Sequence, residues 1–189
     1  MFTINADFIG NFKLGDNINY NLDILNYSYK RLADPDDEDS HLLRKPIIIT
    51  IASICEAILH DLHFRMKNYT QEGVMGLSEK FLSIIRLKII DQFETYIASA
   101  KKNKLLGTKS SDIYKNLDEL RKLRNRIHIQ NQKNEFELDE DKAFNISRQV
   151  TAEKTLEELI KIISSNHPRP SHIKSYVNDF VLPWTKHLP

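Results

Sequence analysis

The segment over residues 46–66 carries apolar side chains around most of a helix and contains no turn signal. Its opening, Ile47 to Ile51, has the composition of a strand. The apolar pattern nevertheless continues well beyond the length of a typical strand, and Pro46 suits the first turn of a helix. Because so broad an apolar surface must be covered on several sides, the segment predicts a central buried helix.

Glycine and proline divide the rest of the chain. Only 5 glycines and 6 prolines are present, and they cluster between long periodic segments. This distribution favours helices joined by loops over strands at short spacing. We predict an all-α fold, an up-and-down bundle of about five helices. Besides the central helix, the predicted helices cover residues 18–32, 78–102, 111–129 (with Ser111 as N-cap) and 140–164.

The length of 189 residues suits one hydrophobic core. We predict a helical domain over residues 1–165 and a proline-containing C-terminal tail over residues 166–189. The tail also contains Trp184, and its sequence is compatible both with docking on the domain and with mobility.

Charge and cysteine content restrict the class of protein. The formal net charge of +1 gives no global field for nucleic-acid binding, so any RNA contact must come from a local basic patch. The single cysteine, Cys55, excludes an internal disulfide, fits a reducing compartment and is expected to be a buried thiol. We expect no signal peptide. We also expect no membrane span, since polar residues interrupt the longest apolar stretch. These features predict a cytoplasmic protein with no membrane partner.

The densest basic cluster lies in residues 120–128. On a helix, Arg124 projects from within the apolar arc, His128 lies one turn further on, and Arg121 stands at the edge of the arc. Arginine is rarely buried without a partner, so these side chains need an ion pair, an interface or a chemical task. The apolar arc itself consists of Ile113, Leu117, Leu120, Leu123 and Ile127.

This segment resembles the signature of HEPN domains, small all-helical domains found in bacterial toxins, phage-defence proteins and RNA-processing nucleases. The family pattern is an arginine, usually followed by a polar residue such as asparagine, then four to six residues and a histidine. Six residues separate Arg121 from His128, whereas three separate Arg124 from His128. Either Arg121 is the family arginine and Arg124 an accessory one, or the spacing is shortened. The signature spans about ten residues, with a looser similarity over residues 78–131.

The resemblance implies a HEPN-like bundle that acts as a metal-independent endoribonuclease, needs no cofactor and cleaves RNA by attack of the 2′-hydroxyl. Arg121 and Arg124 would stabilise the phosphate, His128 would be the acid or base, and Asn125 would orient these groups. Histidine titrates near neutral pH and arginine stays charged, which suits these roles. The implied assembly is a homodimer formed through the motif helix, with a cognate antitoxin as a further partner. Two further basic residues of the segment, Lys122 and Arg126, are expected to contact RNA.

A second interpretation of the same residues is a catalytically inactive HEPN-like module that serves dimerisation or regulation. In that case Arg124 pairs with a carboxylate such as Glu56 or Asp91, Arg121 pairs with Asp118, and His128 is a helix-end histidine. The two interpretations differ in one respect. An enzyme needs arginine and histidine open to a cleft, whereas an inactive module can bury them in ion pairs.

A third interpretation, a metal-dependent hydrolase, rests on Glu56, His60 and His63, which share one helix face. Two histidines and a carboxylate can ligate zinc, iron or manganese. The paired Glu-x-x-His motifs of di-metal bundles are absent, however, and the three residues also form the only polar side of an apolar helix. We therefore predict no metal site.

Overall fold

The protein is mostly helical, which confirms the all-α prediction. The computed structural model describes residues 1–69, 74–128, 139–173 and 176–188. The α-helices are α1 (Phe12–Leu32), α2 (Arg44–Asn68), α3 (Glu79–Arg86), α4 (Phe93–Lys102), α5 (Asp112–Asn125), α6 (Glu140–Ala143) and α7 (Ile146–Asn166), with short 3₁₀ turns at Ser40–Leu43 and Ser171–Ile173 and strands β1 (Phe2–Ile4) and β2 (Phe180–Leu182).

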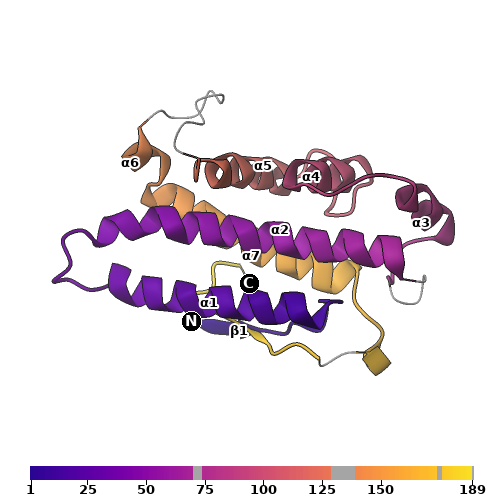
Figure 1. Ribbon diagram of the computed structural model, residues 1–189, viewed down its shortest axis with the longest axis horizontal. Helices are drawn as coiled ribbons and strands as arrows, with labels where there is room; N and C mark the ends of the chain where they lie inside the picture. The colour runs from indigo at the N-terminus through magenta and orange to yellow at the C-terminus, as the bar shows by residue number, and fades with distance from the viewer. Residues whose placement is uncertain (70–73, 129–138, 174–175, 189) are drawn as a thin grey trace.

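Helix α2 is the central helix, as its apolar pattern predicts. It contacts α1 on one side, α4 and α5 on the opposite side, and α7 behind (Figure 1). The long helices α1, α2, α5 and α7 run in alternating directions, which gives an up-and-down bundle. Ile48, Ile51, Leu59 and Leu62 of α2 are completely buried. Cys55 is buried among them, and this burial raises the pKa of its thiol, as expected for a structural cysteine.

The prediction of one long helix over residues 78–102 is wrong, because the chain forms α3 and α4 with a break between them. The Ser78 side chain caps α3 by accepting from the Phe81 N–H. After the break, the Thr95 hydroxyl accepts from the N–H groups of Asp91 and Gln92 and fixes the start of α4. Such local bonds offer the backbone an alternative to continued helix. Ile89 lies in the break and is 84% exposed.

Three other helices differ clearly from the predicted ones. Helix α1 begins earlier, because the Asn11 side chain accepts from the Leu14 N–H and caps it there. Helix α5 ends at Asn125, before the expected end at Ile129, which lies outside the described residues. The last predicted helix is divided into α6 and α7, because Asn145 caps α7 by accepting from the Arg148 N–H.

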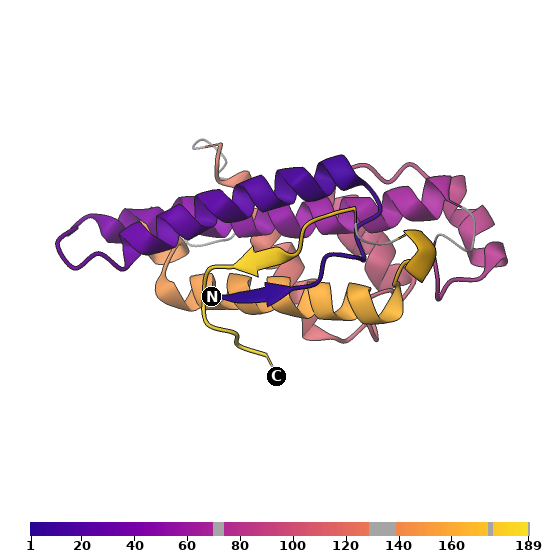
Figure 2. The ribbon, with the colours of Figure 1, turned by 90° about the horizontal axis from the view of Figure 1, so that it is seen from below.

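The C-terminal segment packs on the bundle. Strand β2 pairs with β1 in antiparallel register and lies over α1 and α7, on the side away from α4 and α5 (Figure 2). Trp184 is 5% exposed and donates its indole N–H to Glu157 on α7 at 2.8 Å. The same carboxylate accepts from the backbone N–H groups of His187 and Leu188. The sequence left open whether this segment docks on the domain or is mobile, and in the structure it is docked.

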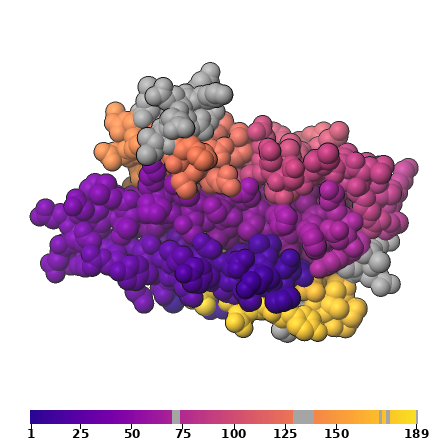
Figure 3. All heavy atoms as spheres, in the orientation of Figure 1, coloured from indigo at the N-terminus to yellow at the C-terminus, as the bar shows by residue number. Residues whose placement is uncertain are grey.

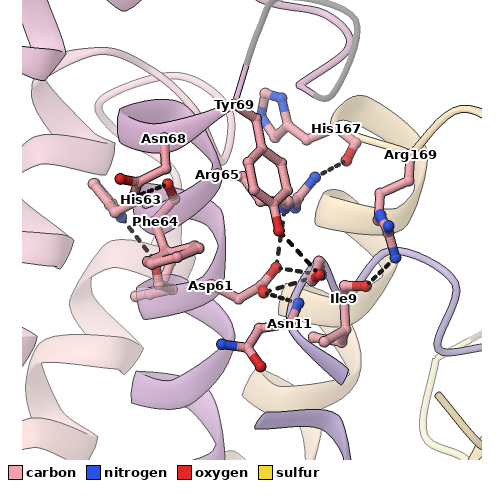
Figure 4. Close-up of polar contacts among 12 residues, drawn as sticks. Ile9, Asn11, Asp61, His63, Phe64, Arg65, Asn68, Tyr69, His167 and Arg169 are labelled. Carbon is pink, nitrogen blue, oxygen red and sulfur yellow. Dashed lines mark hydrogen bonds and ion pairs between the residues drawn. The ribbon is translucent and has the colours of Figure 1, made fainter. Parts of the chain in front are cut away.

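A buried ion pair near the end of α2 connects both ends of the chain to the central helix (Figure 4). Arg65 and Asp61 are 0% and 1% exposed, and the Arg65 Nε lies 2.9 Å from Asp61 Oδ2. Asp61 also accepts from the N–H groups of Gly10 and Asn11, while Arg65 donates to the His167 carbonyl at 3.0 Å. The pair therefore orders the segment before α1 and the segment after α7 at once.

Within the described part of the chain, none of the helices has the length and apolar character that crossing a bilayer requires.

Candidate functional site

The predicted site residues lie at the C-terminal end of α5. Arg121, Arg124 and Asn125 occupy its last turns, and His128 follows three residues after its end. The His128 backbone N–H donates to the Asn125 carbonyl at 3.2 Å, which closes a turn beyond the helix. The His128 side chain is exposed. The site is therefore at the surface, beside α6 in Figure 1.

Arg124 reaches across to the central helix. Its guanidinium contacts the Glu56 carboxylate of α2 at 2.8 Å and donates to the Asn125 side-chain oxygen at 3.3 Å. Glu56 is thus the partner among the two carboxylates considered from the sequence. The Arg124 side chain remains 38% exposed, so the ion pair orients the guanidinium without removing it from solvent.

Arg121 is less accessible. It contacts Asp118 one turn earlier at 2.8 Å and Glu94 of α4 at 3.4 Å, with 17% of its side chain exposed. Lys122 also contacts Asp118, at 3.0 Å. Burial alone would raise the pKa of the Asp118 carboxyl. The hydrogen bonds from Lys122 and Arg121 outweigh this effect and hold the pKa below its usual value. The Arg121–Asp118 pair is the one that the second interpretation of the sequence contained.

Arg126 lies next to a hollow that the sequence did not reveal. Its guanidinium contacts Glu140 of α6 at 2.6 Å, and Lys45 of α2 pairs with the same carboxylate. Both cations lie over the Phe144 ring, 6.0 Å and 5.5 Å from its centroid. Lys45, Glu140 and Phe144, together with Arg44, border a hollow of about 510 Å³. A cationic surface with an aromatic wall is a combination that binds single-stranded nucleic acid.

The residues that line this hollow carried no sequence signal, because they come from segments far apart in the chain: Arg44 and Lys45 begin α2, whereas Glu140 begins α6 and Phe144 follows it. Local periodicity cannot indicate such a juxtaposition.

Glu56, His60 and His63 share one face of α2, but each has a different protein partner. Glu56 pairs with Arg124, the His60 Nδ1 hydrogen-bonds the Tyr96 hydroxyl at 2.8 Å, and the His63 Nδ1–H donates to the Leu59 carbonyl at 2.8 Å. Over the described ranges, no three or more His, Cys, Asp or Glu side chains are grouped so as to hold a metal ion.

A polar strip therefore runs along α2. It connects the arginine-containing end of α5 with the polar face of α2, which the sequence presents as separate candidate sites. It leads from Arg124 through Glu56 to His60 and then to Tyr96 of α4. These side chains come from α2, α4 and α5, three helices that contact one another. Helices α4 and α5 belong to the layer above α2 in Figure 3.

No protein-family model, no curated protein and no solved structure matches this chain.

Proposed function

We propose that this chain is a HEPN-like, metal-independent endoribonuclease, of the toxin, defence or RNA-processing kind, whose active centre is the end of α5. The observation that supports the proposal best is that an exposed His128 follows, within about one turn, an Arg124 that Glu56 orients and that stays partly open to solvent. A general base and a fixed, accessible guanidinium on neighbouring turns are the groups that RNA cleavage requires.

The chemistry follows from the two side chains. The neutral imidazole of His128 removes the proton of a ribose 2′-hydroxyl, and that oxygen attacks the adjacent phosphorus. Arg124 stabilises the additional negative charge on the phosphate oxygens. The bond from phosphorus to the 5′-oxygen breaks, and this oxygen takes a proton. The products are a 2′,3′-cyclic phosphate and a 5′-hydroxyl.

A homodimer with two facing α5 ends completes the proposal, since the second copy supplies another histidine as the proton donor. Asn125, which accepts from Arg124 at 3.3 Å, helps to orient the guanidinium. The hollow beside Arg126, with Arg44, Lys45 and the Phe144 ring, then carries the neighbouring part of the RNA strand.

Cleavage in the presence of a chelator tests this proposal. We expect the wild-type protein to cut single-stranded RNA in excess EDTA, to leave cyclic-phosphate ends, and to leave the same strand uncut when its riboses are replaced by 2′-deoxyriboses. The products are identified by mass spectrometry. A strict requirement for a divalent cation, or equal cleavage of the deoxy strand, would contradict the mechanism.

A second candidate function, an inactive dimeric interaction module, is favoured by one specific observation: Arg121, Arg124 and Arg126 each have a carboxylate partner. In such a module these pairs are purely structural, and the α5 end is a dimer interface.

Glu56→Gln separates the two candidate functions. If Arg124 binds phosphate, the Glu56 carboxylate competes with RNA for its guanidinium. A partly exposed ion pair contributes about 1 kcal/mol or less, so removing this carboxylate increases RNA affinity by up to about fivefold. Affinity is measured by fluorescence anisotropy with the non-cleaving His128→Ala protein as background. Glu119→Gln is the matched control, since Glu119 lies on α5 and pairs with the exposed Lys115. Unchanged affinity in Glu56→Gln together with a lower melting temperature would favour the interaction module.

A further inference from the structure

A second hollow, of about 410 Å³, lies between α2, α3 and α4. It is bordered by His60, His63 and Lys67 of the last turns of α2, by Arg86 at the end of α3, and by Tyr96 of α4. None of these residues belongs to the α5 end or to the hollow beside Arg126. Its volume falls within the range of small-molecule sites.

Aromatic rings form much of the wall of this hollow. The His63 and Tyr96 ring centroids are 5.1 Å apart, those of His60 and Tyr96 5.8 Å, and those of His60 and Phe64 6.2 Å. The hydrogen bond between His60 and the Tyr96 hydroxyl fixes two of these rings relative to each other. Rings held in this way provide a surface for stacking a flat heterocycle.

His63 has an unsatisfied acceptor. Its side chain is 2% exposed, and because Nδ1–H donates to the Leu59 carbonyl, Nε2 carries the lone pair of the neutral ring. Burial lowers the pKa of His63 to about 4, so the ring is neutral at physiological pH. Nε2 has no hydrogen-bond partner among the described residues. Since a buried acceptor without a donor is costly, a ligand N–H or O–H here is favourable.

Two cations and one carboxylate complete the border. Lys67 is half-buried on the last turn of α2. Arg86 is held by Glu79 and by the Tyr69 carbonyl, to which it donates at 2.9 Å. Asp91 is exposed. The two cations can bind a phosphate, and the Asp91 carboxylate can accept a hydrogen bond from a sugar hydroxyl.

We propose that this hollow binds a phosphorylated nucleoside. The base stacks on the aromatic wall and donates to His63, a ribose hydroxyl donates to Asp91, and the phosphate contacts Lys67 and Arg86. This chemistry is shared by a free mononucleotide and by one nucleotide of an RNA strand. The inference concerns binding only and does not depend on whether the chain cleaves RNA.

Binding measurements with His128→Ala protein test this site without interference from cleavage. The probes are AMP, a short single-stranded RNA and inorganic phosphate, measured by isothermal titration calorimetry. Lys67→Gln, at the end of α2, and His63→Phe, which keeps an aromatic ring but removes the acceptor, are each expected to weaken AMP or RNA binding about tenfold. Lys30→Gln, an exposed lysine of α1, is the matched control and should change nothing.

The three probes distinguish the sources of the ligand. Tight AMP binding that both substitutions weaken supports a nucleotide site open to free nucleotides. Binding of RNA alone, weakened in the same way, supports a site for one unit of a strand. Inorganic phosphate that binds as well as AMP would overturn the role of the aromatic wall. No binding of AMP or RNA, or binding that Lys67→Gln leaves unchanged, would overturn the proposal, even if His63→Phe failed to fold.

Discussion

Asp61→Ala is expected to lower the free energy of unfolding by about 3–5 kcal/mol, since it leaves the Arg65 guanidinium buried without its counter-charge. Burial lowers the pKa of Arg65, and the Asp61 carboxylate opposes this effect by stabilising the charged form. The substitution also removes the acceptor of the Gly10 and Asn11 N–H groups, so the segment before α1 loses its attachment. Urea unfolding followed by circular dichroism measures the loss.

Two further variants make this measurement specific. Asp23→Ala removes an exposed carboxylate from α1 and should change stability by less than about 0.5 kcal/mol. The double variant Asp61→Leu/Arg65→Met replaces both charges by apolar groups and should be clearly more stable than Asp61→Ala. A loss of less than 1 kcal/mol in Asp61→Ala would contradict the view that this pair holds the chain ends to α2.

His128→Ala is expected to lower the rate of RNA cleavage by about 10²–10⁴-fold, the usual contribution of a general base. Its effect on stability should be small, because His128 is an exposed residue in a turn beyond α5. Single-turnover rates, measured in EDTA, report the chemical step directly. Arg124→Ala should reduce the same rate by about 100-fold through the loss of phosphate stabilisation.

The control for this experiment is His172→Ala, which removes another exposed histidine, from the short 3₁₀ turn after α7. It should cleave at the wild-type rate. If His128→Ala cleaves RNA as fast as wild type, the end of α5 is not the active centre, and any activity must reside elsewhere in the chain.

The sequence predicts most of the bundle because helix formation and burial leave a local periodic pattern. The apolar residues around α2 require cover on several sides whatever the rest of the chain does, and this alone identifies the central helix. The break between α3 and α4 escapes that reasoning. Thr95 is an ordinary helix-surface residue by pattern, and only the hydrogen bonds of its hydroxyl with the Gln92 backbone show that a helix starts there.

The same distinction applies to the site. An arginine within an apolar arc indicates that a partner exists, and the sequence named Glu56 as one of two choices. Which carboxylate pairs with Arg124 depends on how α5 packs on α2, across 68 residues of chain. The same holds for Phe144 and Lys45, which border one hollow although they lie far apart in sequence.

The sequence by itself determined the all-α class, the central helix and the dense basic segment at the end of α5, because each follows from residues within a few turns of one another. Tertiary structure alone decided the docking of the C-terminal segment through Glu157, the choice of Glu56 as the partner of Arg124, and the hollow that contains His63. Those features depend on contacts between distant segments, and such contacts are fixed by the packing of the whole core rather than by any local pattern.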